Sequence, residues 1–519
     1  MITFVKKYSL LALVLMGTLV LSIPMVKSGV IYKFGAGFWG ANGHDGIWHM
    51  ALASSLSRGT FEMPIFAGDQ IKNYHVGFDL FLAGLNIVTK IPITILYFQI
   101  LPVIFAILLG LLTFELTKSK WSVFFVYFGG SLGWVFGGGE SMFWSQQPIS
   151  TLINPPYALS LVLMLTGLIL VQKKRYLWAG VVFAILPHIK IYAGILSFAG
   201  LFVAGLKNKN LFKILGLSLL IYVPSNYRLI TNGTSLLEWQ PGWFLETMMA
   251  VSDRFNWPKY YEAMINYKAS KNYIKGVPAY LIAFLIFFVG NMSTRLLGFM
   301  KFSKNNLFYY TVIVLGTVIP MLVVQKGTAW NTIQFFYYSL FFTGILAGLS
   351  IQRFPKLLKL LIVILTLPTT WLAMPHYLPM RPPAMISNEE LEALSFLKTQ
   401  PSGIVLTPVF EGKNTQAPRP LYEYESTAYV AAYSNHPTYL EDEVNLNITG
   451  YNWPERRKHV LEFWQSSNET LSKNFIVDNN IKYVYLSQVA NNRPKLNLDN
   501  LGFRNIFENS QAAIWSRQF

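Results

Sequence analysis

Long apolar stretches recur through most of the chain and constrain its fold more than any other feature. A helix needs about 20 predominantly apolar residues to cross the core of a bilayer, and fewer where polar flanks reach the interface. Stretches that approach this length lie near residues 8–26, 75–91, 94–116, 121–138, 156–171, 176–189, 191–206, 210–224, 277–294, 307–324, 331–350 and 356–374. With only 13% charged residues, the chain is predicted to be an α-helical polytopic membrane protein.

Basic residues cluster in short segments between the apolar stretches, and such clusters accumulate on the cytoplasmic side. The clusters are Lys6-Lys7, Lys118 with Lys120, 173–175, Lys207 with Lys209, 295–304 and 353–359. We therefore expect a cytoplasmic N-terminus in the cytoplasmic membrane. The segments expected to face outward are 27–74, 139–155, 225–276, 325–330 and everything after 374.

This orientation leaves one conflict in the helix count. Two apolar stretches lie between the outward loop that ends near residue 74 and the inward cluster at Lys118, where an odd number of crossings is required. One of the two must therefore be re-entrant or interfacial, unless the Lys118 cluster faces outward. About 11 full crossings remain.

The net charge of +17 and the absence of cysteine exclude several classes of function. The positive charge is spread over many short loops and is not gathered on one face, so we expect no nucleic-acid partner. Without cysteine there are no disulfides, thiolate metal sites or cysteine nucleophiles. No convincing small-x-small cleavage site lies near residues 22–28, so the first apolar stretch is interpreted as a retained anchor.

The composition changes after Pro382-Pro383, where a second domain is expected. Ser387 and Glu390 form a capping-box pattern at the start of a helix. Helices are predicted at 387–400, 453–464 and 469–479, and strands at 403–407, 482–486 and 512–515. Strands that alternate with helices indicate an α/β domain. We expect a transmembrane domain over residues 1–380 and a soluble extracytoplasmic α/β domain over 385–519.

The outward segment 225–276 is rich in aromatic residues, which favour the headgroup layer of a membrane. These residues are Trp239, Trp243, Phe244, Phe255, Trp257, Tyr260 and Tyr261. An interfacial helix is predicted near 242–253.

The strongest candidate for chemistry is the stretch 43–49, just after the first apolar segment, where His44 and His49 flank Asp45. Asp45 could simply cap a helix over 46–56, but a cap does not explain the two histidines. Asp45 and His49 stand four residues apart and would share a helix face. They could act as a base with its orienting partner, or as two metal ligands.

Further polar residues lie where outward loops meet apolar stretches. His75 and Asp79 open the second stretch, and an ionisable group at membrane depth indicates function when it faces a cavity. Glu140 is a candidate second carboxylate, with a solvated loop residue as the alternative. The candidates for binding the substrate, including its phosphate, are His75, His188, Lys190, Arg228, Lys326, Asn331 and Gln334.

The segment containing His188 and Lys190 leaves two interpretations open. Pro187-His188-Ile189-Lys190 interrupts an apolar run, either as a break between two helices or as a kink at Pro187. A short solvated turn would serve no binding role. Lys326 and Arg228 are outward cations that run against the orientation bias, which makes them better anion-site candidates than cytoplasmic lysines.

The chain resembles the GT-C superfamily of integral membrane glycosyltransferases. The resemblance rests on His44-Asp45-Gly46-Ile47-Trp48-His49 in a long outward loop, on the Tyr74-His75-Val76-Gly77 start of the next helix, and on a helix bundle with an exported C-terminal domain. It implies transfer of a sugar from a polyprenyl-phosphate-linked donor to an acceptor on the outer side. An acidic residue of the first loop would be the base or bind a metal ion, and Asp45 matches that position.

One departure from the family pattern affects the metal. Many members carry a second acidic residue near the first, whereas positions 44 and 46 here are His and Gly. A divalent ion such as Mg²⁺ or Mn²⁺, held by Asp45 and His49, therefore stays an open alternative. The competing function is a transporter or flippase of lipid-linked sugar or polysaccharide, which the absence of an internal repeat disfavours.

Overall fold

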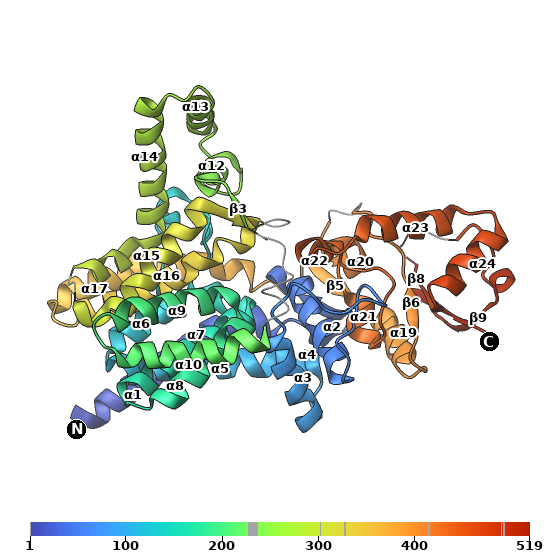
Figure 1. Ribbon diagram of the computed structural model, residues 1–519, viewed down its shortest axis with the longest axis horizontal. Coiled ribbons are helices and arrows are strands. Elements are labelled where there is room, and N and C mark those ends of the chain that lie inside the picture. The colour runs from blue at the N-terminus through green and yellow to red at the C-terminus, as the bar shows by residue number, and fades with distance from the viewer. Residues whose placement is uncertain are drawn as a thin grey trace. The chain divides into compact units, whose positions relative to one another are not determined.

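The computed structural model describes residues 2–226, 237–300, 303–325, 329–412, 416–488, 490 and 494–518, with side chains from residue 8 onward. The described chain forms two compact units (Figure 1). Unit 1 consists of Met1–Ile23 and Pro102–Leu378, and unit 2 consists of Pro24–Leu101 and Pro379–Phe519.

Unit 1 is built almost entirely from helices. They are α1 (Ile2–Val26), α5 (Leu101–Thr117), α6 (Lys120–Phe128), α7 (Pro155–Gln172), α8 (Tyr176–Ile189), α9 (Ile191–Gly205), α10 (Asn210–Ser225), α12 (Trp243–Ala250), α13 (Pro258–Ala269), α14 (Tyr273–Met292), α15 (Leu307–Leu322), α16 (Gln334–Ile351), α17 (Lys356–Thr366) and α18 (Pro368–Ala373). Figure 1 shows α7, α8 and α10 packed side by side. Short 3₁₀ segments, among them η3 (Gly133–Phe136), η4 (Pro148–Ile153) and η5 (Ser293–Phe299), join these helices.

The length and composition of the helices support a multi-pass membrane protein. In the described residues, seven helical segments are long and apolar enough to cross a bilayer, and four more apolar helices have 10–17 residues. The stretch 121–138 differs from the prediction, because α6 ends at Phe128, before Gly129-Gly130. The total of about 11 crossings therefore stays a prediction.

The two stretches in conflict form different kinds of helix. The later one is continuous from Ile93 to Thr117, with a π-helical turn η2 (Leu96–Ile100) between α4 (Ile93–Ile95) and α5. The earlier one forms α3 (Gly77–Thr89), whose 13 residues rise about 20 Å, less than the roughly 30 Å of a bilayer core. Helix α8 has only 14 residues, so helix length alone does not identify the stretch that does not cross.

The aromatic segment of unit 1 folds into α12, α13 and α14, which lie together in Figure 1. The helix expected near 242–253 is present as α12. Its aromatic residues Trp243 and Phe244 are buried in a protein core with Phe287 and Phe336, whereas Trp239 is 70% exposed. The interfacial placement expected for the whole segment therefore does not hold for Trp243 and Phe244. Strand β3 (Leu237–Trp239) pairs antiparallel with β4 (Val323–Gln325).

Unit 2 contains two four-stranded sheets. The first has the order β1 (Ile31–Tyr32), β2 (Gly35–Phe38), β5 (Ala384–Ile386) and β7 (Arg419–Pro420). Ala36 of β2 pairs with Ile386 of β5, so the first loop completes a sheet with the C-terminal part of the chain. Gly35 has φ +117°, and a Cβ there would overlap the carbonyl of Ile386, so this crossing requires glycine.

The second sheet contains the strands that the sequence predicts. Its order is β6 (Ile404–Leu406), β8 (Ile481–Ser487), β10 (Ala512–Arg517) and β9 (Phe503–Glu508), of which only β9 was not expected. The predicted helices form as α19 (Asn388–Lys398), α23 (Trp453–Gln465) and α24 (Glu469–Asp478). The Ser387 hydroxyl accepts the Glu390 N–H, as the capping box predicts.

The expected domain boundary near residue 380 differs from the observed division in one respect. The segment 24–101, expected to belong to the transmembrane domain, groups with 379–519 instead. The β2–β5 pairing explains this grouping, and so does Arg58, whose guanidinium donates to Asn435.

Candidate active site

The stretch around Asp45 begins the buried helix α2 (Asp45–Ser57) of unit 2, after the turn η1 (Gly40–Gly43). His44 stands at the N-cap position and makes no side-chain cap hydrogen bond, while Asp45 is the first helical residue. The alternative in which Asp45 caps the helix is therefore wrong. A carboxylate in the first turn is still favoured by the helix dipole. Gly46 allows the close approach of the Phe98 ring, which a Cβ would meet at 2.7 Å.

His44 links two carboxylates. Its Nδ1 lies 3.0 Å from Oδ1 of Asp45, and its Nε2 lies 3.2 Å from Oδ1 of Asp442. Burial lowers the pKa of His44, but the charge and hydrogen bond of Asp442, together with Asp45, hold that pKa well above its ordinary value. The imidazole is therefore a cation at neutral pH that donates from both nitrogens.

The carboxylates on either side of His44 differ in exposure. The side chain of Asp45 is 53% exposed, whereas that of Asp442 is fully buried. Asp442 also accepts the backbone N–H of Asn445 at 3.0 Å and its side-chain amide at 2.8 Å, as the N-cap of α22 (Glu443–Thr449). Only Asp45 of the two can meet a substrate.

His49 has a different partner from the one that the sequence suggested. Its Nδ1 lies 2.7 Å from Oδ1 of the fully buried Asp79 on α3, and its ring stacks on Tyr97. The expected pairing of Asp45 with His49 is therefore replaced by two separate pairs. His75 lies against Tyr74, with ring centroids 4.8 Å apart, and Tyr74 in turn contacts His49. His49 and Asp79 thus hold α2 against α3, with His75 at the edge of the same aromatic cluster.

Asp45 and His49 do not form the pair of metal ligands that the sequence left open, because each has a different partner. Among the residues that the structure describes, no group of three or more His, Asp or Glu side chains could hold a metal. The ring nitrogens of His44 face two carboxylates as donors, and Nδ1 of His49 is directed at Asp79. The open alternative of a metal held by Asp45 and His49 gains no third ligand here.

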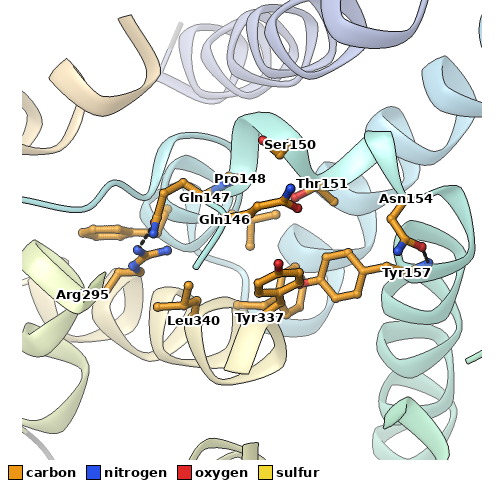
Figure 2. A pocket seen from close by; sticks show the side chains of 13 residues that line it. Gln146, Gln147, Pro148, Ser150, Thr151, Asn154, Tyr157, Arg295, Tyr337 and Leu340 are labelled. Atoms are coloured by element: carbon orange, nitrogen blue, oxygen red, sulfur yellow. Dashed lines mark hydrogen bonds between the residues drawn. The ribbon is translucent and has the colours of Figure 1, made fainter. Parts of the chain in front are cut away.

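Unit 1 contains a polar cavity of about 470 Å³ of empty space, shown in Figure 2. Its walls come from the segment before α7, from the start of α16 and from η5. The polar residues lining it are Gln146, Gln147, Ser150, Thr151, Asn154, Tyr157, Arg295 and Tyr337.

Arg295 is the one cation of this cavity lining and is 1% exposed. Its guanidinium donates to the side-chain oxygen of Gln147, as Figure 2 shows, and to the carbonyls of Gly130 and Asn291 at 3.1 and 2.6 Å. It has no carboxylate partner within the described part of the chain. A buried guanidinium bound only by neutral acceptors retains its charge for an anion.

The contact of Arg295 with Gln147 conflicts with the sequence interpretation, which placed Arg295 in a cytoplasmic cluster and Gln147 in an outward segment. Residues 293–299 continue α14 as the buried turn η5, and Arg295 contacts Gln147 of a segment expected to face outward. A basic residue just after an apolar helix resembles an orientation signal, so no sequence pattern distinguishes this case.

Two candidate phosphate ligands of unit 1, His188 and Lys190, lie at the junction of α8 and α9. Helix α8 ends at Ile189 and α9 begins at Ile191, so the break between two helices is confirmed over the kink. His188 lies 3.1 Å from Ser225 Oγ and 3.2 Å from Asn226 Nδ2. Lys190 is 7% exposed, and its ammonium lies 5.4 Å from the Tyr192 ring.

Asn331 and Gln334 extend to the cavity of Figure 2. Gln334 donates to Asn331 at 3.0 Å and accepts from the cavity residue Asn154 at 3.5 Å. The neighbouring Thr332 accepts from the Gln325 N–H, and Gln325 accepts from the Tyr192 hydroxyl at 2.9 Å. Arg228 and Lys326, both expected to bind phosphate, lie outside the described residues.

Glu140 is held inside its loop. Its carboxylate accepts from the hydroxyls of Ser150 and Tyr377 and from the Gln147 N–H. Burial raises its pKa, although these hydrogen bonds act in the opposite direction. The loop is therefore ordered around Glu140, and the solvated alternative is wrong.

Sequence reasoning missed Asp442, Arg295 and Arg254. Asp442 lies 398 positions from its partner His44, a separation that no local pattern can bridge. The Arg254 guanidinium lies 4.5 and 5.1 Å from the ring centroids of Trp330 and Trp144, which stack on each other at 4.0 Å. The density of tryptophan near residues 144, 243 and 330 was the available signal for this contact.

Comparison with known proteins gives similar solved structures only. No family model matches the chain, and no curated protein does. The archaeal oligosaccharyltransferase AglB from Archaeoglobus fulgidus, solved with an inhibitory peptide and a dolichol-phosphate, is similar at a TM-score of 0.47 and 10% identity over 93% of this chain and 70% of that one. The same organism's enzyme solved with Zn and sulfate is similar at 0.49 and 12% identity over 92% and 68%.

A further similar structure is ArnT from Cupriavidus metallidurans bound to undecaprenyl phosphate, with a TM-score of 0.37 and 9% identity over 98% of this chain and 97% of that one. At these scores the likeness carries neither the fold nor the activity across. The solved structures to which the chain is similar thus include one in complex with a dolichol-phosphate and one bound to undecaprenyl phosphate.

Proposed function

We propose that this protein is a membrane glycosyltransferase that moves a sugar from a polyprenyl-phosphate-linked donor to an acceptor hydroxyl, with Asp45 as the general base. The proposal extends to the outer side of a cytoplasmic membrane as the place of reaction. The sequence resemblance suggests the donor, and the site in unit 2 supports the base.

One observation carries this proposal: the exposed carboxylate of Asp45 is hydrogen-bonded to a buried, cationic His44 that Asp442 fixes from the other side. The positive charge of His44 keeps the Asp45 carboxylate ionised, and the hydrogen bond from His44 orients it. Asp79 and Asp442 are fully buried and already bound. Asp45 is therefore the carboxylate of this cluster that an acceptor can reach.

The chemistry needs a single base. Asp45 takes the proton of the acceptor hydroxyl while the acceptor oxygen forms a bond to the anomeric carbon of the sugar. At the same time, the bond between the anomeric carbon and the phosphate oxygen breaks. Polyprenyl phosphate leaves with the electron pair. One displacement of this kind inverts the anomeric centre and requires no nucleophilic carboxylate. Asp45 and His49 have different partners and do not form a pair of metal ligands, and we assign no step to Mg²⁺ or Mn²⁺.

The departing phosphate requires positive charge. Within unit 1 by itself, we propose that Arg295 and Lys190 bind a phosphate, because both are cations buried beside polar groups. Asn331 and Gln334 would add neutral donors through Asn154. Lys326 and Arg228 stay candidates from the sequence.

The reaction can be tested with the full chain in liposomes. The substrates are polyprenyl phosphates that carry a radiolabelled hexose or pentose, and membranes from cells lacking the protein supply the acceptor. We expect release of free polyprenyl phosphate together with transfer of the label to a new product.

Two controls give this experiment its meaning. Liposomes without protein measure spontaneous hydrolysis, and a dithionite-type accessibility assay with a fluorescent donor measures translocation. Movement of the intact donor across the bilayer without cleavage of the sugar–phosphate bond would contradict the proposal and favour the flippase.

A further inference from the structure

Unit 2 contains a second cavity, of about 360 Å³ of empty space, whose lining is strongly acidic. Four carboxylates line it, namely Glu425, Glu441, Asp442 and Glu443, and no Lys, Arg or His is among the described residues of the lining. Asp442 belongs to both the cavity wall and the His44 pair, so a single imidazole ring separates Asp45 from this wall.

Three of the four carboxylates are occupied by protein donors. Glu441 accepts the backbone N–H groups of Val430 and Ala431 at 3.0 and 2.9 Å. Asp442 accepts from Asn445 and faces His44, and Glu443 pairs with Arg457. These carboxylates are parts of the fold.

Glu425 is different, because no donor to its carboxylate exists among the described residues. Burial raises its pKa, the charge of His44 opposes this, and the charges of Asp45 and Asp442 raise it further. Arg419, which also acts on Glu425, lies over the Tyr424 ring at 4.6 Å from its centroid. Glu425 thus presents to the cavity a carboxyl group to which no described residue donates a hydrogen bond.

A second wall group also lacks a partner within the described chain. Thr427 lines the cavity, is 5% exposed, and its buried hydroxyl makes no hydrogen bond there. A buried hydroxyl without a partner is costly and is usually satisfied by a ligand or water. Glu425 and Thr427 therefore both indicate a ligand that donates hydrogen bonds.

We propose that this cavity binds a protonated amine of the acceptor, with Glu425 as its ion-pair partner and Thr427 as a hydrogen-bond partner. Among the described residues, the lining offers a phosphate carboxyl groups and no cation, so the occupant is the acceptor and not the lipid-phosphate donor. That this amine belongs to the acceptor rests on the proposed function. The position of the cavity beside the His44–Asp45 pair would bring the acceptor hydroxyl to the base.

The test is a binding measurement on the purified full chain without donor. Two matched pairs of probes are titrated: glucosamine against N-acetylglucosamine, and Nα-acetyl-lysine amide against Nα-acetyl-norleucine amide. Each pair differs in one positive charge. We expect at least one amine probe to bind about tenfold more tightly than its neutral counterpart, as a charge-assisted hydrogen bond provides.

Variants locate the binding. Glu425→Gln is expected to remove the preference for the amine, and Thr427→Val to weaken amine binding several-fold. Glu423→Gln, two residues away and outside the cavity lining, is the matched control and should bind as the unmodified protein does. Thermal unfolding of each variant verifies that it is folded.

The outcomes separate this inference from the proposed function. Equal binding of amine and neutral probes, no binding of either, or full binding by folded Glu425→Gln would overturn the inference. Asp45→Asn should lose transfer but keep amine binding. If no variant or donor supports transfer while the amine preference persists and depends on Glu425, the proposed function fails and the binding site remains.

Discussion

At the scale of single residues, the site depends on how burial is distributed over three neighbouring groups. His44 is buried and bridges Asp45 and Asp442, of which only Asp45 meets solvent. The buried carboxylate fixes the ring, and the ring fixes the exposed carboxylate. Such an arrangement separates the group that reacts from the groups that hold it.

Protonation in unit 2 predicts a pH dependence of stability. Burial raises the pKa of Glu441 to about 8 from 4.5, and Asp442 holds that of His44 above its ordinary value against burial. Both groups bind protons more tightly when folded. Their contribution to the free energy of unfolding is therefore complete at pH values below the pKa values of the unfolded state. It is lost as the pH rises through the pKa values of the folded state.

We expect the thermal midpoint of the purified protein to fall as pH rises from 4.5 to above 8, the range spanned by Glu441. Glu441→Gln removes one titrating group and should flatten this slope. Differential scanning fluorimetry in detergent measures the thermal midpoint of both proteins at each pH. An equal slope in both proteins would show that Glu441 does not titrate in this range.

Which residues of the site could be predicted from the sequence depends on how far apart they lie along the chain. Asp45 and His44 are adjacent, and their unusual combination beside an apolar stretch could be recognised without a structure. The partners Asp442 and Asp79 could not be assigned, because pairing across 398 and 30 positions is a property of the fold.

At the scale of elements, glycine sets how closely the helices of unit 1 approach. Gly348 of α16 lies against the backbone of Ser122 on α6, whose hydroxyl also donates to the Ile345 carbonyl at 2.9 Å. A Cβ at Gly348 would overlap this backbone, so the two helices would have to separate.

Gly348→Ala should therefore destabilise unit 1 by about 1–3 kcal/mol, the usual effect of overpacking. Gly216→Ala on α10 is the matched control, because nothing lies within 4 Å of its added Cβ. It should be neutral or stabilising by up to about 1 kcal/mol. The thermal midpoints of the two variants are compared. Equal midpoints would contradict the close contact between α6 and α16.

Most elements were predictable where local pattern and capping decide. The helix at Ser387 and the strands β6, β8 and β10 appear where periodicity indicated them. The short strands β2 and β5 were not predicted. Strand β2 has four residues, two of them glycine, which give no strand pattern, and it forms only by pairing with β5. Grouping of the first loop with the C-terminal part could not be foreseen for the same reason.

At the scale of the whole molecule, orientation in the membrane stays a prediction from the basic clusters. The absence of cysteine allows a clean test, since each introduced thiol is the only one. Lys209 and Ser467 are both exposed, in unit 1 and unit 2 respectively.

In intact cells, Ser467→Cys should react with a membrane-impermeant maleimide, and Lys209→Cys should react only after permeabilisation. This outcome follows if basic loops are cytoplasmic and the region after residue 374 is exported. The reverse pattern would invert the orientation and move the proposed reaction to the cytoplasmic side.

The central claim, that Asp45 is the base, is tested most directly by single-turnover sugar transfer with purified protein. Asp45→Asn keeps the size of the side chain and removes its basicity, and Asp69→Asn alters a carboxylate elsewhere in the same loop. We predict that Asp45→Asn lowers the transfer rate by about 10²–10⁴-fold while donor binding and the thermal midpoint stay unchanged, and that Asp69→Asn retains the full rate. A rate for folded Asp45→Asn equal to that of the unmodified protein would contradict the account.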